Sequence, residues 1–365
     1  MKGSRFILTV ALSVLGLFTI GGIGFAQRPP TYRHVPELGR FFNGVKIAAP
    51  IVEQGLAIYP VLVDDVPLLH GAWQTLDEAI SRGTLVISEQ NGGSVPLVSV
   101  ENRSKNNYIL LMMGDVIKGG MQTRTVRHDS VLGPGQRIDL EVFCVEAHRW
   151  QGTPSFSAAN AKVPQSVQSE LRRGGSQGEV WKEVAENNAL LGAENDTGSL
   201  ERALKNPTVE RKLDAVRKRV VPAIPRGTVG FIFVHNGRAA GAEFFGSEAL
   251  ARAEFSTLLD SYAVDYVILG GASHWADAND NRAATQFFER VCRTGSERVK
   301  TAGSGTGIRT QADGLLGDGV SLDATLVHFG IQVERKVQPG QPEVIWPNQE
   351  NRPERGRGPG GPLDP

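Results

Sequence analysis

The 365-residue chain contains only two cysteines, no excess of either charge and none of the common spacings of metal-binding histidines. Its 39 lysine and arginine residues balance 39 aspartate and glutamate residues, so no overall field favours nucleic acid or an anionic surface. Its seven histidines form no H-x-H or H-E-x-x-H pair, and we therefore predict no metal site and no cofactor. These absences leave an unidentified small molecule or a protein as the expected partner, and no nucleic acid.

The two cysteines, Cys144 and Cys292, are too few for a disulfide framework. They can form one bridge in an oxidising compartment, or each can be a free, buried thiol. Cys292 lies on the apolar side of a predicted helix with Phe288 and Val291. This position favours free thiols, although pairing stays open.

One long hydrophobic run is present, and it lies at the N-terminus. Lys2 and Arg5 precede an uncharged apolar run over residues 6–20, and small residues lead to a predicted cut between Ala26 and Gln27. This order is typical of a secretion signal over residues 1–27 and predicts an exported protein, periplasmic or extracellular. The alternative is a retained membrane anchor over residues 6–26, which is long enough to cross a bilayer.

The rest of the chain is expected to form one domain. We predict a proline-containing spacer over residues 28–38, a single α+β domain over 39–336, and a disordered proline- and glycine-rich tail over 337–365. A domain of this length can bury a sizeable core.

The order of elements predicts an α+β fold. Short strand-like segments separated by turns fill residues 84–145 and indicate a sandwich or barrel-like antiparallel sheet. A polar, helical middle is expected over residues 156–221, and a mixed half follows it. Further predicted features are a helix ending at 81 with a Thr75/Glu78 capping box, a hairpin turn at Asn236-Gly237, a helix over 248–262, a strand over 264–270 and a helix over 280–293.

Two polar segments within the β-rich half could carry chemistry. In a strand, Gln122 and Arg124 share one face, and Cys144 and Glu146 share one face of a later strand. If the two strands are neighbours, these side chains converge. An arginine beside a glutamate can close a sheet end as a structural pair, or it can present to an anion beside the amides of Gly119-Gly120.

These segments resemble the ARG and rhodanese-phosphatase-superfamily-associated protein domain, an uncharacterised bacterial domain. The resemblance covers residues 40–332, and Asp115 stands where a glutamate is usual. The family name implies genomic company with ADP-ribosylglycohydrolases and phosphatase-like proteins, and so hints at nucleotide or ADP-ribose chemistry. The matching residues are Gly114-Asp115, Gly119-Gly120, Gln122, Arg124, Cys144-Val145-Glu146 and Arg149-Trp150.

Three hypotheses follow. The first is an exported module that binds a ligand or protein partner through a patch of polar residues. The second is an enzyme on an anionic, nucleotide-like or ADP-ribose-like substrate, with Asp115 or Glu146 as acid or base, or Cys144 as nucleophile. The third is a purely structural envelope protein. An exported location argues against nucleotide chemistry. The predicted binding residues are Gly119, Gly120, Gln122, Arg124, Glu146, Arg149 and Trp150.

Overall fold

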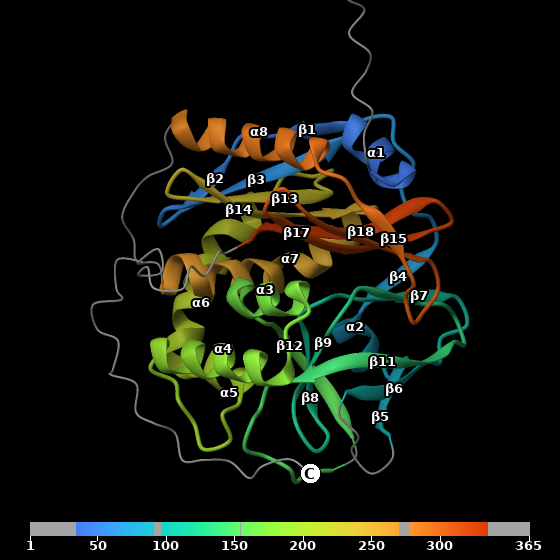
Figure 1. The fold of residues 1–365 in the computed structure, drawn as a ribbon, viewed down its shortest axis with the longest axis vertical. Coiled ribbons are helices and arrows are strands. Elements are labelled where there is room, and N and C mark those ends of the chain that lie inside the picture. Colours follow the sequence, from blue (N-terminus) through green and yellow to red (C-terminus); the bar gives the residue numbers. More distant parts are fainter. Residues whose placement is uncertain (1–33, 91–95, 154, 270–277, 335–365) are drawn as a thin grey trace, which may run out of the picture. The chain divides into compact units, whose positions relative to one another are not determined.

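The computed structural model describes residues 34–90, 96–153, 155–269 and 278–334, which form an α+β domain (Figure 1). The segments predicted to be the export signal and the C-terminal tail lie outside the described residues. The first described helix, α1 (Pro36–Asn43), begins within the last residues of the predicted spacer. No helix in the described part of the chain is long and apolar enough to span a membrane.

A nine-stranded antiparallel sheet organises one half of the domain. Its strand order is β1-β3-β13-β14-β18-β17-β16-β15, and β2 also pairs with β3. The strands are β1 (Val45–Ile47), β2 (Ile51–Glu53), β3 (Leu56–Val63), β13 (Gly230–His235), β14 (Arg238–Phe245), β15 (Glu297–Val299), β16 (Thr306–Ala312), β17 (Leu315–Leu322) and β18 (Thr325–Val333).

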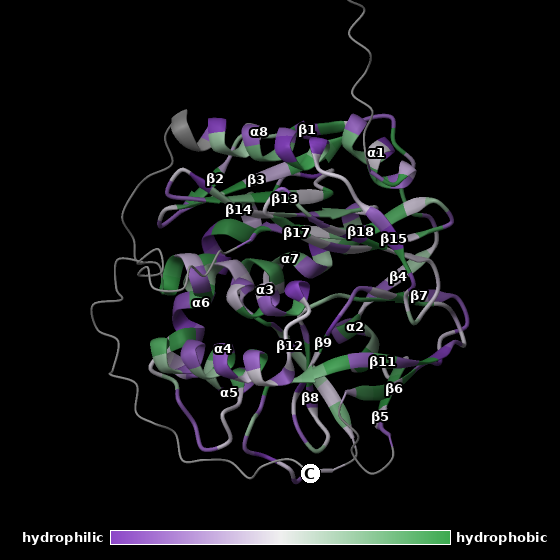
Figure 2. Cartoon of the chain, viewed as in Figure 1, coloured by the Kyte–Doolittle hydropathy of each residue, from purple (hydrophilic) through white to green (hydrophobic). Residues whose placement is uncertain are grey.

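Alternate residues of this sheet enter two different cores, as the two-residue period of a strand requires. Tyr59 and Ile232 join the core beneath α1 and α8 (Ala278–Arg293), whereas Ile58 and Phe233 face the helices on the other side. Figure 2 shows hydrophobic residues along β3 and both hydrophilic and hydrophobic residues along α8, as expected for a helix with one buried face.

The other half contains the smaller sheets. A six-stranded antiparallel sheet has the order β12-β8-β9-β11-β6-β5, and a three-stranded sheet has the order β10-β7-β4, with β4 and β7 parallel. This arrangement confirms the expected β-rich N-terminal half. The strands are β4 (Ala72–Thr75), β5 (Leu85–Glu89), β6 (Leu97–Asn102), β7 (Asn107–Leu111), β8 (Asp115–Gly119), β9 (Arg124–Val126), β10 (Ser130–Leu132), β11 (Arg137–Cys144) and β12 (Phe156–Lys162).

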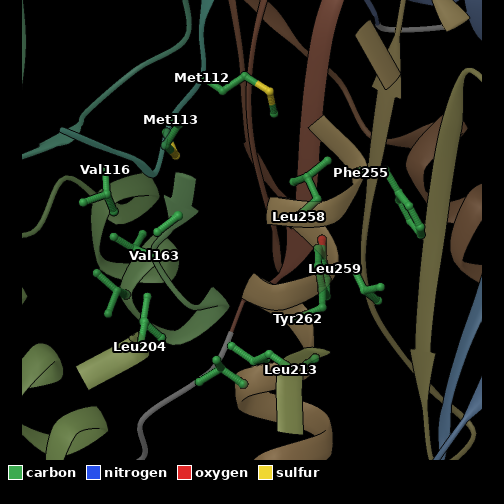
Figure 3. Packing of buried hydrophobic residues seen from close by; sticks show 14 of the residues in the cluster. Met112, Met113, Val116, Val163, Leu204, Leu213, Phe255, Leu258, Leu259 and Tyr262 are labelled. Atoms are coloured by element: carbon green, nitrogen blue, oxygen red, sulfur yellow. The ribbon is translucent and has the colours of Figure 1, made fainter. Parts of the chain in front are cut away.

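Helices fill the space between these sheets. In α7 (Glu248–Ala263), Phe255, Leu258, Leu259 and Tyr262 pack toward the core, together with residues of α6 (Pro207–Val220) and of the β-rich half (Figure 3). Helix α7 contacts both β12 and β14, and so lies against strands of two sheets. The remaining helices are α2 (Leu76–Ser81), α3 (Gln165–Arg173), α4 (Gln177–Leu190) and α5 (Leu200–Leu204), with a 3-10 turn at Val221–Ala223.

Several local predictions are confirmed. Thr75 and Glu78 form the capping box of α2, and Asn206 caps α6. Asn236 and Gly237 both have positive φ angles, 48° and 72°, and join β13 to β14 as a tight hairpin turn requires.

Two local predictions are wrong. Residues 156–162 form the strand β12 instead of a helix, because antiparallel pairing with β8 outweighs the helical preference of their alanines. The predicted strand over 264–270 is instead a π-helix at Val264–Ile268 that continues α7. A short apolar run does not distinguish a strand from a buried helix, and no glycine or proline stops α7 before it.

Candidate functional site

The structure brings the predicted residues Gln122, Arg124 and Cys144 together. Cys144 on β11 pairs in register with Arg124 on β9. The fully buried Arg124 guanidinium donates to the Gln122 side chain at 3.1 Å and contacts the Cys144 sulfur, and it lies 3.5 Å from the carboxylate of Glu89. Three of the four side chains expected to converge therefore meet, and they contact one another in the interior.

Glu146 and Arg149 form a second set of contacts beside this group. A single oxygen of Glu146, Oε2, accepts from the backbone and hydroxyl of Thr123 and from Arg149 at 2.7 Å. Burial alone would raise the pKa of Glu146, but the hydrogen bonds from Arg149 and Thr123 lower it to about 2. This carboxyl is therefore ionised at any physiological pH and does not carry a proton for acid catalysis.

Arg149 also ties together the loop that contains Gly119 and Gly120. Its guanidinium donates to the carbonyls of Gly119, Gly120 and Gln151. Both glycines have positive φ angles, and a Cβ on Gly120 would clash with the Phe156 ring. The Gly120 amide donates to Ser155. The glycine carbonyls and this amide are thus used within the protein.

The remaining predicted residues differ in exposure. Trp150 is 48% exposed. Cys144 is buried, and burial raises its pKa to about 11 despite the neighbouring Arg124, so it is an unreactive thiol at neutral pH. Both cysteines are free, as we favoured. These contacts favour a structural role for the motif residues.

A polar cleft of about 540 Å³ lies elsewhere, between α2, α6, α7 and β12. Ligand sites commonly have volumes of about 300–1,000 Å³. Successive turns of α7 supply Ala253, Ser256, Thr257 and Asp260 to one wall. Their spacing puts them on the helix face opposite Leu258 and Tyr262. The full lining is Thr75, Asp77, Glu78, Ser81, Arg82, Asn160, Lys205, Glu210, Arg217, Ala253, Glu254, Ser256, Thr257 and Asp260.

Arg217 of α6 lies at one end of this cleft, and it contacts Asp260 of α7 and Glu210 of its own helix, each at 2.5 Å. One guanidinium thus faces two carboxylates, and Asp260 Oδ1 has no hydrogen-bond partner among the described residues. The other end is lined by α2, β12 and the first half of α7.

Asp77 lies at that other end and is held by an irregular strand. The β12 register shifts between Ala158 and Lys162, and Asn160 has a φ of 46° within this bulge. The Asn160 amide donates to the Asp77 carboxylate at 3.0 Å. Bulges and left-handed non-glycine residues are common beside functional sites.

Asp115, Lys162 and Glu254 form a buried carboxyl–lysine cluster, of which Glu254 lines the cleft together with the half-buried Asp77. Lys162 is fully buried; it hydrogen-bonds Asp115 and lies 3.7 Å from Glu254. Asp115 also accepts from the Met112 amide at 2.8 Å. Glu254 is only 4% exposed, lines the cleft, and receives no hydrogen bond from any described residue. The predicted candidate Asp115 and the cleft-lining Glu254 are thus both partners of Lys162.

A second buried ion network joins the large sheet to the loop before β10. The His328 ring on β18 bonds Asp129 through Nδ1 and Glu243 through Nε2 at 3.0 Å. Burial alone would lower the pKa of His328, but the two carboxylates raise it to about 9. Asp318 accepts from the Asp129 amide and from His128, at the edge of a small cavity of about 70 Å³. His328 is therefore an imidazolium at neutral pH and a structural link between halves.

The sequence prediction did not include the residues of the cleft. A signal was present for Glu254 alone, because it interrupts an otherwise apolar face of α7. Ionisable residues in such positions are buried together or lie at a site. Which of them meet depends on chain pairings that sequence spacing does not show.

The described residues thus form an α+β protein with mostly antiparallel sheets, buried ion networks and a polar cleft. The chain belongs to the family of the ARG and Rhodanese-Phosphatase-superfamily-associated Protein domain, which matches residues 44–331. This confirms the predicted resemblance over most of the chain. No curated protein and no solved structure matches the chain.

Proposed function

We propose that the protein is a small-molecule-binding module whose ligand occupies the cleft between α2, α6, α7 and β12. The observation that supports this most directly is Asp260, which lines the cleft and whose Oδ1 atom is buried without a hydrogen-bond partner among the described residues. Burying an unsatisfied polar group costs about 1–3 kcal/mol. A ligand that hydrogen-bonds this oxygen would recover part of that cost.

The chemistry of the lining favours a polyhydroxylated ligand. Five carboxyl groups line the cleft against three basic groups, so an anionic ligand is disfavoured. Ser81, Ser256 and Thr257 supply hydroxyls, and Asn160 supplies an amide. We therefore propose a short saccharide or amino sugar in place of a nucleotide.

The motif residues support this site indirectly. Arg124, Glu146 and Arg149 bond one another or the neighbouring backbone. We propose that they hold the β8–β9 loop, which begins at the strand that carries Asp115. In this proposal a ligand is not expected at the motif residues themselves.

Titration calorimetry tests the proposal with glucosamine, N-acetylglucosamine and their β-1,4-linked disaccharides as probes. We expect saturable binding that is lost in Ser256→Trp, which fills the cleft. Thr285→Trp, on an exposed position of α8, is the matched control and retains binding. A saccharide that binds Ser256→Trp as well as wild type contradicts the proposed location.

ADP-ribose and ATP serve as anionic comparison probes. Binding of these probes without any binding of the saccharides would favour the alternative of an anionic substrate. A chain that binds none of the probes contradicts the saccharide assignment and favours the structural alternative.

We also propose that the protein is exported by residues 1–27. Expression in a bacterial host with a periplasm should yield a mature chain that begins at Gln27, measured by intact mass. A chain that keeps residues 6–26 and fractionates with membranes would favour the anchor alternative.

A further inference from the structure

We propose that a second cleft, lined by α6, the π-helix and the β2–β3 turn, binds an organic anion with an apolar body. This cleft has a volume of about 450 Å³, within the range of about 300–1,000 Å³ that is common for small-molecule sites. It shares no lining residue with the proposed saccharide site, so the two sites are independent. We call it the basic groove; its lining residues are Gln54, Thr208, Arg211, Lys212, Ala215, Val267 and Ile268.

One stripe of α6 supplies the charged wall of the basic groove. Four lining residues follow one another at the spacing i, i+3, i+4 and i+7, which places them along one side of the helix. The two acidic residues of α6, Glu210 and Asp214, lie off this stripe, and no carboxyl group lines the groove among the described residues. A cleft lined by charges of one sign concentrates ions of the opposite sign. The groove therefore attracts anions.

The positive charge of this stripe is not neutralised within the described part of the chain. Three of the five basic residues of α6 form ion pairs with carboxylates of α6, α7 or β2. These pairs are Arg217 with Glu210 and Asp260, Lys218 with Asp214, and Arg219 with Glu53. The other two, Arg211 and Lys212, have no ion-pair partner among the described residues, and both line the groove. The uncompensated charge of α6 thus lies on the groove side of the helix.

Arg211 is oriented by its own helix. Its guanidinium donates to the Pro207 carbonyl at 3.1 Å and to the Thr208 hydroxyl at 3.4 Å. Both acceptors are uncharged, so these hydrogen bonds direct the side chain and leave its charge without a counter-ion. A guanidinium in this state forms strong, charge-assisted hydrogen bonds with a carboxylate, sulfonate or phosphate group.

The π-helix Val264–Ile268 supplies an apolar wall. Its residues Val267 and Ile268 both line the groove; Val267 is buried and Ile268 half-buried, and both pack against the core of α6 and α7. A π-helical turn is rare and is frequent at functional sites, because it displaces side chains from their regular helical positions. Here it presents two consecutive apolar side chains, and Ala215 adds a third apolar group from α6.

These two walls define the class of ligand. A charged head group is expected at Arg211 and Lys212, and an alkyl or aryl body against Val267, Ile268 and Ala215. An inorganic ion would leave most of the volume and the whole apolar wall unused. The groove therefore fits an amphipathic carboxylate, sulfonate or phosphate ester.

Titration calorimetry of the full chain tests this class with octanoate, octanamide and octylammonium. The three probes have similar hydrocarbon bodies and differ in the charge of the head group. We expect saturable binding of octanoate at one site, binding of octanamide that is weaker by about tenfold or more, and no binding of octylammonium. Octylammonium that binds as well as octanoate overturns the assignment of an anion.

Substitutions on α6 test the location. Arg211→Gln and Lys212→Gln each remove one unpaired charge at an exposed position, and each should weaken octanoate binding by about tenfold. Lys218→Gln is the matched control, because it removes a charge of the same helix that is paired and lies outside the groove. It should bind octanoate as wild type does. Ala215→Glu adds a carboxylate to the groove and should abolish binding, while circular dichroism shows that the variants are folded.

The remaining outcomes separate this proposal from the saccharide site. Ser256→Trp fills the other cleft and should leave octanoate binding unchanged, whereas its loss in this variant would overturn the groove as the anion site. Folded wild-type protein that does not bind octanoate overturns the proposal, as does octanoate binding that persists in a variant with both Arg211→Gln and Lys212→Gln. Neither result affects saccharide binding, which is measured with different probes and lost in a different variant.

Discussion

Arg149 shows how one side chain can account for much of a sequence motif. It donates hydrogen bonds to three carbonyls and one carboxylate that lie on separate segments around Gly119 and Gly120. The motif spacing follows from this geometry, since the glycines, Glu146 and Arg149 must meet at one point. A recurrent pattern of this kind marks a fold-determining contact as readily as a ligand site.

Arg149→Ala should therefore lower the free energy of unfolding by about 2–4 kcal/mol, because it also leaves the buried Glu146 carboxylate without its cation. Urea denaturation measures this loss. Arg238→Ala, at an exposed position of the β13–β14 hairpin, should change stability by no more than about 0.5 kcal/mol. Loss of ligand binding in Arg149→Ala with unchanged stability would instead restore the binding hypothesis for the motif.

His328 predicts a dependence of stability on pH. Its pKa rises from 6.5 to about 9 on folding, so its contribution is fully present below pH 6.5 and is lost as pH rises through 9. His328→Gln removes the buried cation that Asp129 and Glu243 share, although Glu243 keeps Tyr262 and Arg172 as partners, and should cost about 3–5 kcal/mol at pH 6. Urea denaturation should show that the difference in free energy of unfolding between wild type and variant becomes smaller by pH 10. A constant difference across this range would contradict the assigned charge.

Residue patterns in the sequence predicted some of these neighbours and missed others. Gln122, Arg124 and Cys144 were predicted together because two-residue spacing fixes a strand face. The cleft residues Asp77, Asn160 and Glu254 come from segments separated by about 80 and 90 residues. Their meeting depends on tertiary packing, which single-sequence periodicity does not encode.

At the scale of elements, the short helix α2 determines where Asp77 lies. A helix of six residues has little stability of its own, so its capping box contributes a large share of its order. The capping box of α2 was predicted from the sequence. The strand β12 beside it was not, because its alanines and polar residues lack the usual strand composition.

Thr75→Ala should cost about 1 kcal/mol of stability by removing this cap. Ser176→Ala removes the equivalent capping box of α4, outside the cleft lining, and is the matched control. Urea denaturation should show similar losses for the two variants. Only Thr75→Ala should also weaken saccharide binding in calorimetry, and equal binding by both would contradict a role for α2 in the site.

At the scale of the whole molecule, the two cysteines do not link its parts. Burial raises the pKa of Cys144 to about 11 and that of Cys292 to about 12, and neither is bonded to the other. Protein denatured without reductant should therefore take up two iodoacetamide groups, whereas the native protein should react slowly. An intact mass two hydrogens below the expected value would reveal a bridge and contradict the structure.

The fold class was predictable at this scale, whereas the topology was not. Turn residues and strand-like segments indicated the β-rich half. The family resemblance, over residues 40–332, covered nearly the same range as the family match over residues 44–331. The large sheet, however, pairs β3 with β13, about 170 residues later in the chain. Such pairings come from burial of both sheet faces and are not visible as a local pattern.

The register shift in β12 has a consequence for how the chain can change in length. A one-residue slip moves every following side chain of a strand to the opposite face. The bulge advances β12 by four residues, from Ala158 to Lys162, against two on β8, so deleting Asn160 would remove one of its two extra residues. Lys162 would then turn away from Asp115 and Glu254, which would leave buried carboxyls without a cation. This strand should therefore accept substitutions at its exposed positions far more readily than an insertion or deletion. In a library of single-codon deletions, variants with a deletion in β12 should be depleted among the folded proteins.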